Sequence, residues 1–488
     1  MDAESFRRDG HQLIDWIADY LAHPERYPVL AQVEPGQVKA SLAKEPPEKP
    51  EALEAVLQDV EKIIAPGLTH WNHPGFFAYF GITGSGPGIL GELLSSAFNV
   101  NAMLWRTSPA ATELEELVMD WLRQLLGLPP EFMGIINDSA SVSSLCAIAI
   151  AREALGLSIR EDGLAGRPEL PRLRLYTSEQ AHSSIEKAAI VLGIGQAGVV
   201  KVAVDDEFRL RSEALEAAVT EDLKAGRKPF CVVATVGTTS TTSVDPVPEI
   251  ADICQRHKLW LHVDAAYAGA AALLSEKRWA LAGCERADSI VMNPHKWLFV
   301  PLDCSAFYCR HPGVMKQAFS LVPEYLRTPE EDRVHNFMDY GIQLGRRFRA
   351  LKLWMVLRAF GSEGLRQHLR AHIALAERFR GWIEASPSFE LLAPVPFSVV
   401  CFRHRPDGLP ENGETEDYLN RLNERLLDSV NRAGEVFLSH TQLNGRFTLR
   451  LAIGNVRTTE AYVRLAWDLL QEHAERLDAE LRPAALRG

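Results

Sequence analysis

A lysine follows directly on a short apolar run in the segment SIVMNPHKWLF, residues 289–299. The apolar residues 290–292 predict a buried strand, and Asn293, His295 and Lys296 come within the next four positions. A lysine at the end of a buried strand either extends its amine to water or is held in place for chemistry. The residues that follow the neighbouring strands distinguish these two roles.

Four other predicted strands also end in polar or titratable groups. These groups are found at 138–141, 178–182, 237–239 and Asp264. Taken singly, a serine cluster is typical of a helix cap, and a lone histidine or strand-end aspartate is usually structural. The carboxyl ends of parallel strands meet at one edge of a sheet. All these strand ends together therefore favour one shared site over separate structural roles.

A lysine, an acid, an imidazole and the start of a helix together match the chemistry of pyridoxal phosphate. A lysine amine bonds to the cofactor aldehyde, a carboxylate pairs with the pyridine nitrogen, and a helix N-terminus holds the phosphate. Asp264 is a suitable partner for the pyridine nitrogen, because an ionised carboxylate stabilises the protonated form of that nitrogen. The protonated cofactor ring can then accept electrons. A helix is predicted to begin near Val142. Ser141 and the backbone amides of 139–141 open this helix and could bind the cofactor phosphate. Lys296 is then the cofactor-binding lysine.

The elements that must position these groups alternate between about residue 130 and residue 310. The apolar runs are FMGIIND, LRLYTS, VVKVAV, FCVVATVG, LWLHVD, SIVMNP and SAFYC, and amphipathic helical patterns follow most of them. Such alternation predicts an α/β protein with a mostly parallel, doubly wound sheet that binds its ligand at the carboxyl ends of the strands. The expected site therefore coincides with the polar strand ends.

The rest of the chain divides into regions of different character. Residues 1–80 are helical and then proline-rich, which is typical of an arm that packs on another surface. We expect 81–350 to form the large cofactor-binding domain. Longer helices and a few late strands predict a smaller C-terminal α+β domain over 351–488.

Composition excludes several classes of protein. The 488 residues are 47% hydrophobic and carry a formal charge of −12, which disfavours a nucleic-acid or anionic-membrane surface. The sequence contains no apolar run of about 18 residues, the length needed to span a membrane. The acidic start of the chain is unlike a signal peptide. Seven scattered cysteines without a CxxC pair predict reduced thiols in the cytoplasm and no metal site. The basic run within 346–352 lies on a helical pattern and predicts structural ion pairs.

Several segments closely resemble the aromatic-L-amino-acid decarboxylases, the group II pyridoxal-phosphate-dependent decarboxylases. They are HVDAAYAG (262–269), NPHKWL (293–298), EQAHSSIEKA (179–188), SPAATELE (108–115) and LGRRFRALKLW (344–354). The resemblance extends from FRRDGHQLIDWIADYL near the start to RLAIGNVRTTE near the end. It implies the PLP-dependent fold type I, like that of aspartate aminotransferase. It also implies an obligate homodimer with the active site at the interface, where residues 1–80 pack on the partner subunit.

The resemblance also implies roles for individual residues. Lys296 matches the lysine that bonds to the cofactor, Asp264 the partner of the pyridine nitrogen, and His182 the imidazole stacked on the cofactor ring. Further cofactor-contacting positions match Ala140, Ser141, Thr239, Asn293 and His295. Substrate-facing positions match Tyr79, Phe80, Ile82, Met103, His182 and Gly345. At Ile82 the chain departs from the animal enzymes of the family, which carry a threonine near the substrate carboxylate.

The segment AFSLVPEYLRTPEEDRVHNF (318–337) is charged, contains proline and has weak periodicity, so it predicts a surface loop. The family's mobile catalytic loop falls here, and its reactive tyrosine matches Tyr325. Such a loop would close over the site and exclude water. The implied reaction is decarboxylation of an aromatic L-amino acid, with Tyr325 returning a proton to Cα, directly or through His182.

Two alternatives to this reaction remain open from the sequence. Some close relatives convert the amino acid to an aldehyde and carry phenylalanine at the loop position, so Tyr325 argues against that activity. A non-catalytic dimeric homologue would have no need of the intact Lys296, Asp264 and His182. Among substrates, Gly345 matches a pocket position where relatives that prefer indole substrates carry glycine, which leaves room for a bicyclic ring, so the resemblance favours tryptophan. DOPA, phenylalanine and tyrosine remain alternatives.

Overall fold

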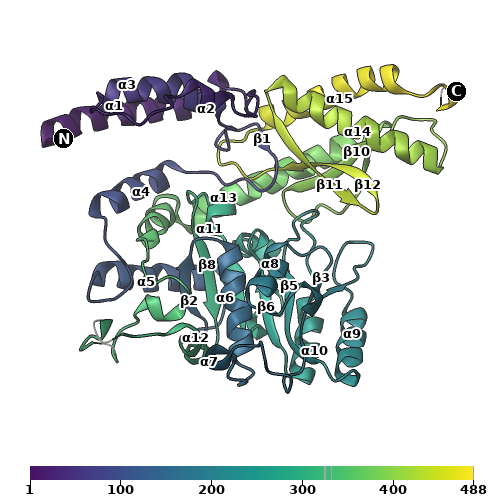
Figure 1. The fold of residues 1–488 in the computed structure, drawn as a ribbon. Coiled ribbons are helices and arrows are strands. Elements are labelled where there is room, and N and C mark those ends of the chain that lie inside the picture. Colours follow the sequence, from purple (N-terminus) through teal and green to yellow (C-terminus); the bar gives the residue numbers. More distant parts are fainter. Residues whose placement is uncertain (324–325, 331, 487–488) are drawn as a thin grey trace. The chain divides into compact units, whose positions relative to one another are not determined.

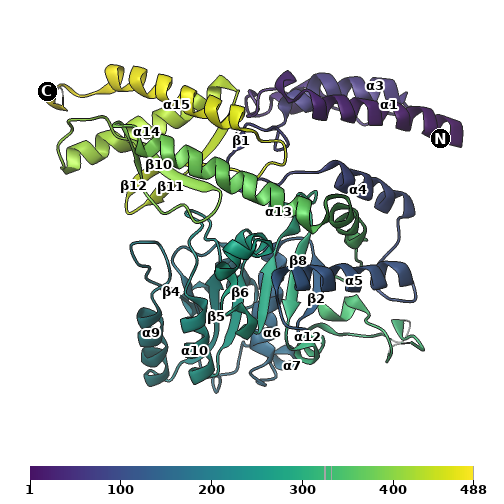
Figure 2. The same ribbon diagram turned by 180° about the vertical axis from the view of Figure 1, so that it is seen from behind.

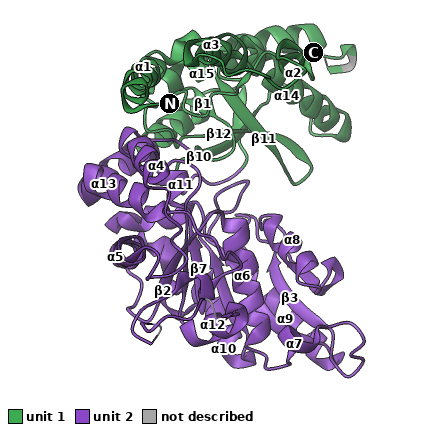
Figure 3. Cartoon of the chain, turned by 60° about the vertical axis from the view of Figure 1, so that its left-hand side comes forward, with its two compact units in different colours: residues 1–81, 374–392, 398–488 green, residues 82–373, 393–397 purple. Residues whose placement is uncertain are grey.

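The computed structural model describes residues 1–323, 326–330 and 332–486, which form two compact units (Figure 3). Unit 1 comprises residues 1–81, 374–392 and 398–488, and unit 2 comprises residues 82–373 and 393–397. The first 81 residues, predicted to form an arm that packs on another surface, thus group with the C-terminal part of the chain. The reason is a short strand, β1 (Phe76–Phe77), which pairs in parallel with β11 (Phe437–Leu443).

Unit 2 is built on a seven-stranded sheet with the order β2-β8-β7-β6-β5-β3-β4. Its strands are β2 (Met133–Asn137), β3 (Leu173–Ser178), β4 (Val199–Val202), β5 (Lys228–Thr235), β6 (Trp260–Asp264), β7 (Ser289–Met292) and β8 (Ser305–Cys309). Strand β8 is antiparallel to both of its neighbours, and the other neighbouring pairs are parallel. The predicted α/β class with a mostly parallel sheet is confirmed.

Helices cover both faces of this sheet, as the opposite views in Figures 1 and 2 show. The helices of unit 2 are α4 (Gly86–Phe98), α5 (Pro109–Leu126), α6 (Ala140–Glu153), α7 (Ile159–Asp162), α8 (Ser184–Val191), α9 (Ser212–Lys224), α10 (Val247–His257), α11 (Pro294–Trp297), α12 (Pro312–Phe319) and the first part of α13 (Arg349–Glu384). Residues of α6, α8 and α12 share one apolar core with the strands. Because both faces are covered, residues 231–234 of β5 are completely buried, which explains its continuous apolar run. Short 3₁₀ segments span Gln196–Gly198, Ala268–Leu273, Ser275–Leu281, Cys284–Arg286 and Phe337–Tyr340.

Unit 1 contains a second sheet with the order β1-β11-β12-β10-β9. Its remaining strands are β9 (Phe389–Leu391), β10 (Val399–His404) and β12 (Arg446–Ala452), and its helices are α1 (Ala3–Ala22), α2 (Gln37–Ser41), α3 (Leu53–Asp59), α14 (Gly413–Ala433), α15 (Glu460–Leu481) and the last part of α13. Short helical turns span Pro24–Arg26, Val60–Ile64, Ala65–Gly67 and Ala484–Leu486. Strands β9 to β12 pair antiparallel, in agreement with the predicted α+β character. Across the described parts of both units, no helix has the length and apolar character required to cross a membrane.

All seven cysteines are free and buried. Burial raises the thiol pKa of Cys146, Cys304 and Cys309 to about 12, so these side chains stay protonated at neutral pH. A protonated, buried thiol is a poor nucleophile and a poor metal ligand. The cysteines therefore act as small apolar core residues.

Candidate active site

Lys296 lies on α11, a single helical turn directly after β7. The Asn293 amide donates to a carbonyl of the loop after β6 (3.0 Å), which holds the start of α11 against that loop. On the other side, Trp297 is fully buried, stacks on Tyr267 with ring centroids 4.7 Å apart, and donates from Nε1 to His372 Nδ1 (3.0 Å). Lys296 itself is only partly buried. The backbone is therefore anchored on both sides of a lysine whose side chain keeps some exposed surface.

Asp264 is the last residue of β6, and only 6% of its surface is exposed. In the sheet it pairs with Thr235 of β5 on one side and Val291 of β7 on the other. Its Oδ1 accepts a hydrogen bond from the Ala266 amide (3.0 Å). The central position of β6 thus delivers a buried carboxylate to the edge of the sheet from which Lys296 also emerges.

His182 lies between β3 and α8, with its ring orientation set by the start of that helix. Nδ1 accepts from the Ser184 amide (3.2 Å) and lies 2.8 Å from Ser184 Oγ. Desolvation lowers the pKa of His182, the nearby Asp264 opposes this shift, and the positive charge of Lys296 adds to it. A nitrogen that accepts a hydrogen bond carries no proton, so the neutral ring carries its proton on Nε2. His182 is therefore near both Asp264 and Lys296 and has a proton to donate.

His295 is buried beside the lysine and supports α11. Its Nδ1 accepts from the Cys304 amide (2.9 Å). Burial, together with the positive charge of Lys296, lowers the pKa of His295 to about 3. The imidazole is therefore neutral at neutral pH, and it adds no charge next to the Lys296 amine.

The start of α6 offers an anion-binding site. Ser139 is the N-cap, and its Oγ accepts from the Val142 amide (3.4 Å). The helix therefore begins at Ala140, and the prediction of a start near Val142 was two residues too late because Ser139 supplies the cap. Amides in the first turn have no acceptor within the helix. Those of Ala140 and Ser141 are consequently available to an anion, and Ser141 is exposed.

Thr239 lies in the tight loop after β5 and is exposed. Gly237 has φ +88°, and a Cβ at this residue would lie 2.6 Å from the Ala268 Cβ, so both the turn and the packing require glycine. Thr238 Oγ1 contacts Thr241 Oγ1 (3.0 Å) and accepts from the Ser243 amide (3.0 Å). These bonds fix the loop and leave Thr239 at its surface.

Taken together, these residues fit pyridoxal phosphate. Asn293 is 2% exposed, and its Oδ1 has no hydrogen-bond donor among the residues that the structure describes. A buried unpaired oxygen is unfavourable, and a bound group with a donor would satisfy it. The same sheet edge supplies the Lys296 amine, the Asp264 carboxylate and the open amides of α6. The donor set is the one that the cofactor requires.

Two of the expected substrate positions, Met103 and Gly345, are in segments that hydrogen bonds join, 101–103 and 345–346. The Ala102 amide donates to the Arg346 carbonyl (2.9 Å), and the Arg346 amide donates to Asn101 Oδ1 (2.9 Å). A Cβ built on Gly345 would lie 3.7 Å from Asn101 Nδ2, an ordinary contact. The Gly345 position is therefore well defined and has room for a small side chain.

A buried ion pair between Arg346 and Glu115 fixes the segment that contains Gly345. The guanidinium donates to both carboxylate oxygens (2.6 and 3.1 Å) and to the Ile136 carbonyl (2.8 Å). Removing one member of such a buried pair typically costs about 3–5 kcal/mol of stability. Arg347 and Lys352 pair with Glu92, and Arg349 pairs with Asp303 (2.7 Å). The predicted structural role of the basic run is confirmed, but sequence reasoning missed Glu115 as the partner, although both segments carry the family resemblance.

Three of the remaining expected residues are near neighbours in the sequence, and the fourth is Tyr325. Tyr79 has φ +53° and is 54% exposed, and it stacks on Trp71 with ring centroids 5.6 Å apart. Phe80 lies under a guanidinium of unit 1, with 4.7 Å between Arg450 Cζ and the ring centroid. Ile82, the first residue of unit 2, is partly buried. Tyr325 lies outside the described residues, so its role stays a prediction.

Comparison with known proteins identifies the family. The pyridoxal-dependent decarboxylase conserved domain matches residues 35–405. The chain belongs to this decarboxylase family. It is 42% identical over 487 residues to tyrosine decarboxylase 4 of Petroselinum crispum, covering 98% of this chain and 94% of the relative. It is 40% identical over 487 residues to phenylacetaldehyde synthase of a Rosa hybrid cultivar, covering 97% and 95%. The crystal structure of Oryza sativa TDC with PLP and tryptamine superposes with a TM-score of 0.93 at 37% identity, covering 98% and 99%.

Membership of the pyridoxal-dependent decarboxylases confirms several expectations from the sequence. The resemblance to aromatic amino acid decarboxylases is confirmed, as is the PLP-dependent fold type I. Pyridoxal phosphate is the cofactor, and the protein is a carboxy-lyase of the aromatic amino acid class. A non-catalytic homologue is therefore not the best account of this decarboxylase.

Proposed function

We propose that the enzyme decarboxylates an aromatic L-amino acid, tryptophan by preference, to the arylalkylamine and CO2. The observation that carries the proposal is the meeting of Lys296, the buried Asp264 and the neutral His182 at one sheet edge. When bound, pyridoxal phosphate would accept the electron pair left behind by the departing CO2. The protein's task is to hold the reacting groups in place, exclude water and supply one proton.

Residues from different helices, strands and loops would bind the cofactor. Lys296 would hold the aldehyde carbon, and the α6 amides of Ala140 and Ser141 would hold the phosphate, with Thr239 alongside. Asp264, buried and hydrogen-bonded to a backbone amide, would keep the pyridine nitrogen protonated. An ionised carboxylate in a poorly hydrated site interacts more strongly with a positive charge than it would in water. This is the physical reason for an acid at the end of β6.

The proton returned to Cα is assigned to Tyr325 and His182. The neutral His182 ring carries its proton on Nε2, as deduced from the hydrogen bonds at Nδ1. A general acid acts best when its proton is in place at the working pH. The lowered pKa of His182 means that it would act as a neutral donor or relay, with Tyr325 as the residue that faces Cα.

Replacement of Tyr325 by phenylalanine is expected to divert the product from amine to aldehyde. Without the phenol, Cα would be protonated slowly, and O2 and water could react there to give aldehyde, ammonia and hydrogen peroxide in place of the amine. We expect amine formation to fall about 10²- to 10⁴-fold, the usual contribution of a positioned acid, with peroxide rising. Amine, aldehyde and peroxide are measured in one reaction. An unchanged amine yield would remove Tyr325 from the mechanism.

Conversion to the aldehyde is the second candidate function for the unmodified enzyme. Its support is the 40% identity to the Rosa phenylacetaldehyde synthase over 97% of this chain. Tyr325 favours the amine, because the aldehyde-forming relatives carry phenylalanine at the matching position. An oxygen electrode decides between the two reactions: decarboxylation to amine consumes no O2, whereas aldehyde formation consumes one O2 for each CO2 released.

The preference for tryptophan rests on Gly345. The nearest atom to a Cβ at this position is Asn101 Nδ2 at 3.7 Å, so glycine leaves space that an indole could use. The similar Oryza sativa structure contains tryptamine, an indole amine, whereas the Petroselinum relative is a tyrosine decarboxylase. Amine release from tryptophan, tyrosine, phenylalanine and DOPA, measured as kcat/KM, tests the assignment. An enzyme that ignored tryptophan and turned over tyrosine rapidly would contradict it.

Gly345→Ser is expected to lower kcat/KM for tryptophan more than for tyrosine. The added Cβ makes only an ordinary contact with Asn101, so the protein should fold normally and the change should be confined to the pocket. A serine narrows the space for a bicyclic ring and offers a hydrogen bond to a phenol. Contacts of this size are worth about 1–3 kcal/mol, so we expect a partial shift of about 5- to 150-fold. Equal loss for both substrates would show that Gly345 does not select the ring.

We also propose that the enzyme is a cytoplasmic homodimer. Helix α4 exposes a row of large apolar side chains, Leu90, Leu93, Leu94 and Phe98, each 41–59% exposed. Such a contiguous apolar surface is typical of a protein interface. Phe6, Leu13 and Ile14 of α1 are also exposed, which suits an arm packed on a partner subunit. Sedimentation equilibrium should give twice the mass of the chain.

The proposed cytoplasmic location rests on the cysteines. Their free thiols are typical of a protein in a reducing compartment.

A further inference from the structure

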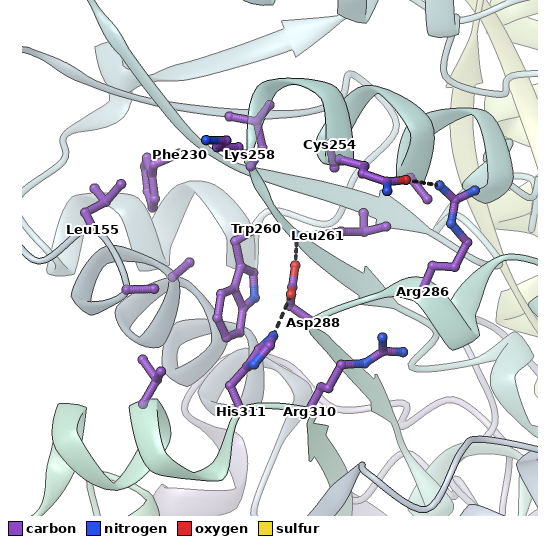
Figure 4. Close-up of a pocket in the computed structure, with 16 residues that line it drawn as sticks. Leu155, Phe230, Cys254, Lys258, Trp260, Leu261, Arg286, Asp288, Arg310 and His311 are labelled. Atoms are coloured by element: carbon purple, nitrogen blue, oxygen red, sulfur yellow. Dashed lines mark hydrogen bonds and ion pairs between the residues drawn. The ribbon is translucent and has the colours of Figure 1, made fainter.

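A pocket lies at the end of the unit 2 sheet opposite to the active site (Figure 4). It is formed where β6 and β7 begin and where β8 ends, and it has a volume of about 570 Å³. Trp260 and Asp264 are the two ends of β6, so the pocket is separated from Asp264 by a strand of about 13 Å. Its size is within the range of small-molecule sites.

The walls of the pocket combine polar and apolar side chains and include two aromatic rings. The larger apolar side chains of the lining are Leu155, Phe230, Leu259, Trp260, Leu261 and Val314. Trp260 is held by a hydrogen bond from Nε1 to Ser289 Oγ (2.9 Å) and by ring contact with His311 at 5.2 Å. A rigid aromatic wall of this kind favours a flat apolar ligand.

Cationic side chains outnumber acidic ones around the pocket. Lys258, Arg286 and Arg310 line it, together with a single carboxylate, Asp288. Asp288 is already engaged, because Oδ2 accepts from the Leu261 amide (2.7 Å) and Oδ1 contacts His311 Nε2 (2.8 Å). The positive charge of the lining is therefore not neutralised by its own acid.

Arg286 and Arg310 differ in how their guanidinium groups are satisfied. Arg286 donates to Asp252 (2.7 Å) and Gln255 (3.1 Å) on α10. The Nε of Arg310 is buried and has no acceptor among the described residues, and the described part of the chain contains no carboxylate in ion-pair distance of this side chain. The Arg310 Cζ lies 5.0 Å from the Phe132 ring centroid, and this contact holds the group in place. Arg310 is thus a positioned cation, and none of the carboxylates that the structure describes pairs with it.

We propose that this pocket binds a small aromatic carboxylate, with the carboxylate on Arg310 and the ring against Trp260 and Phe230. A carboxylate matches the fork of guanidinium donors and forms two parallel hydrogen bonds with it. The aromatic walls account for the rest of the molecule. The ligand needs no α-amino group, because the lining has no acidic side chain free to bind one. The pocket is therefore a second site, distinct from the one that binds the amino acid substrate.

The test is calorimetric titration of the holoenzyme with indole-3-propionate in the presence of saturating tryptamine, the product of the proposed reaction, which is added to fill the active site. Wild-type enzyme should bind the acid, and Arg310→Met should weaken binding about tenfold, the loss expected for a charged hydrogen-bonded pair. Arg256→Met is the matched control, because Arg256 is exposed on α10, pairs with Glu216 and does not line the pocket. This variant should bind as the wild type does. The neutral indole-3-propionamide should bind about tenfold more weakly than the acid.

Three results would each overturn the proposal. They are no binding to the wild type at millimolar acid, equal affinity in the Arg310→Met variant, and loss of binding when tryptamine is added. If Arg310→Met fails to fold, Lys258→Glu replaces it. Lys258 is exposed, so its replacement leaves the core intact, and a negative charge at the rim should weaken binding of the acid while leaving the amide unchanged. Equal effects on acid and amide would also reject a carboxylate site.

Discussion

Lys296→Ala is expected to abolish the visible absorbance of bound pyridoxal phosphate and to lower kcat by at least about 10³-fold. The amine of Lys296 is the proposed covalent attachment point, and the residues on either side, Asn293 and Trp297, are held by hydrogen bonds. Alanine removes the amine without disturbing these contacts. The fold should therefore survive, and the loss should be chemical.

The matched control is Lys187→Ala. Lys187 is exposed on α8 and close enough to His182 to influence its pKa, yet it has no proposed contact with the cofactor. This variant should keep both the visible band and most of the activity. The central assignment would be wrong if the wild-type protein stayed colourless after incubation with pyridoxal phosphate, or if Lys296→Ala kept its colour and its turnover.

Asp264→Asn is expected to reduce turnover far more than it reduces cofactor content. Asparagine keeps the shape of the side chain and can still accept from the Ala266 amide (3.0 Å), but it carries no negative charge. The protonated pyridine nitrogen would lose its stabilising partner, and the cofactor would accept electrons less readily. We expect kcat to fall about 10²- to 10³-fold, similar to the loss of one preorganised electrostatic contact.

The measurement pairs kcat with the amount of pyridoxal phosphate released from each purified variant. Asp264→Glu serves as the control that keeps the charge but changes its position, and it should retain more activity than Asp264→Asn. A parallel loss of cofactor and turnover in Asp264→Asn would show that the carboxylate merely anchors the ring. Because Asp264 also opposes the lowering of the His182 pKa, the neutral variant should shift that pKa further down.

Much of the unit 2 fold was predictable from the sequence because parallel strands covered on both faces are continuous apolar runs. The run FCVVATVG predicted β5, and the polar residues after each run predicted the site at the carboxyl edge. The start of α6 was less predictable. Ser139 and Ser141 are both possible caps by residue type, and the structure selected Ser139 through its hydrogen bond to the Val142 amide.

Features that depend on partners distant in sequence were not predictable. The two residues of β1 carry no periodic signal, yet their pairing with β11 places the first 81 residues in the same unit as the C-terminal part. Arg346 is 231 positions away from Glu115, and no local pattern records that they pair. The pocket around Arg310 likewise combines side chains from strands and helices that are far apart along the chain.

The sequence by itself determined which reactive side chains the protein has and which end of each strand presents them, since apolar runs and caps are local consequences of burial and hydrogen bonding. Only the tertiary structure decided how these side chains behave. The placement of β6 between β5 and β7 buries Asp264, the Ser184 amide sets the proton of His182 on Nε2, and packing around α11 keeps His295 neutral. Protonation and position depend on desolvation and on neighbouring charges, and both arise from contacts that exist only once the chain has folded.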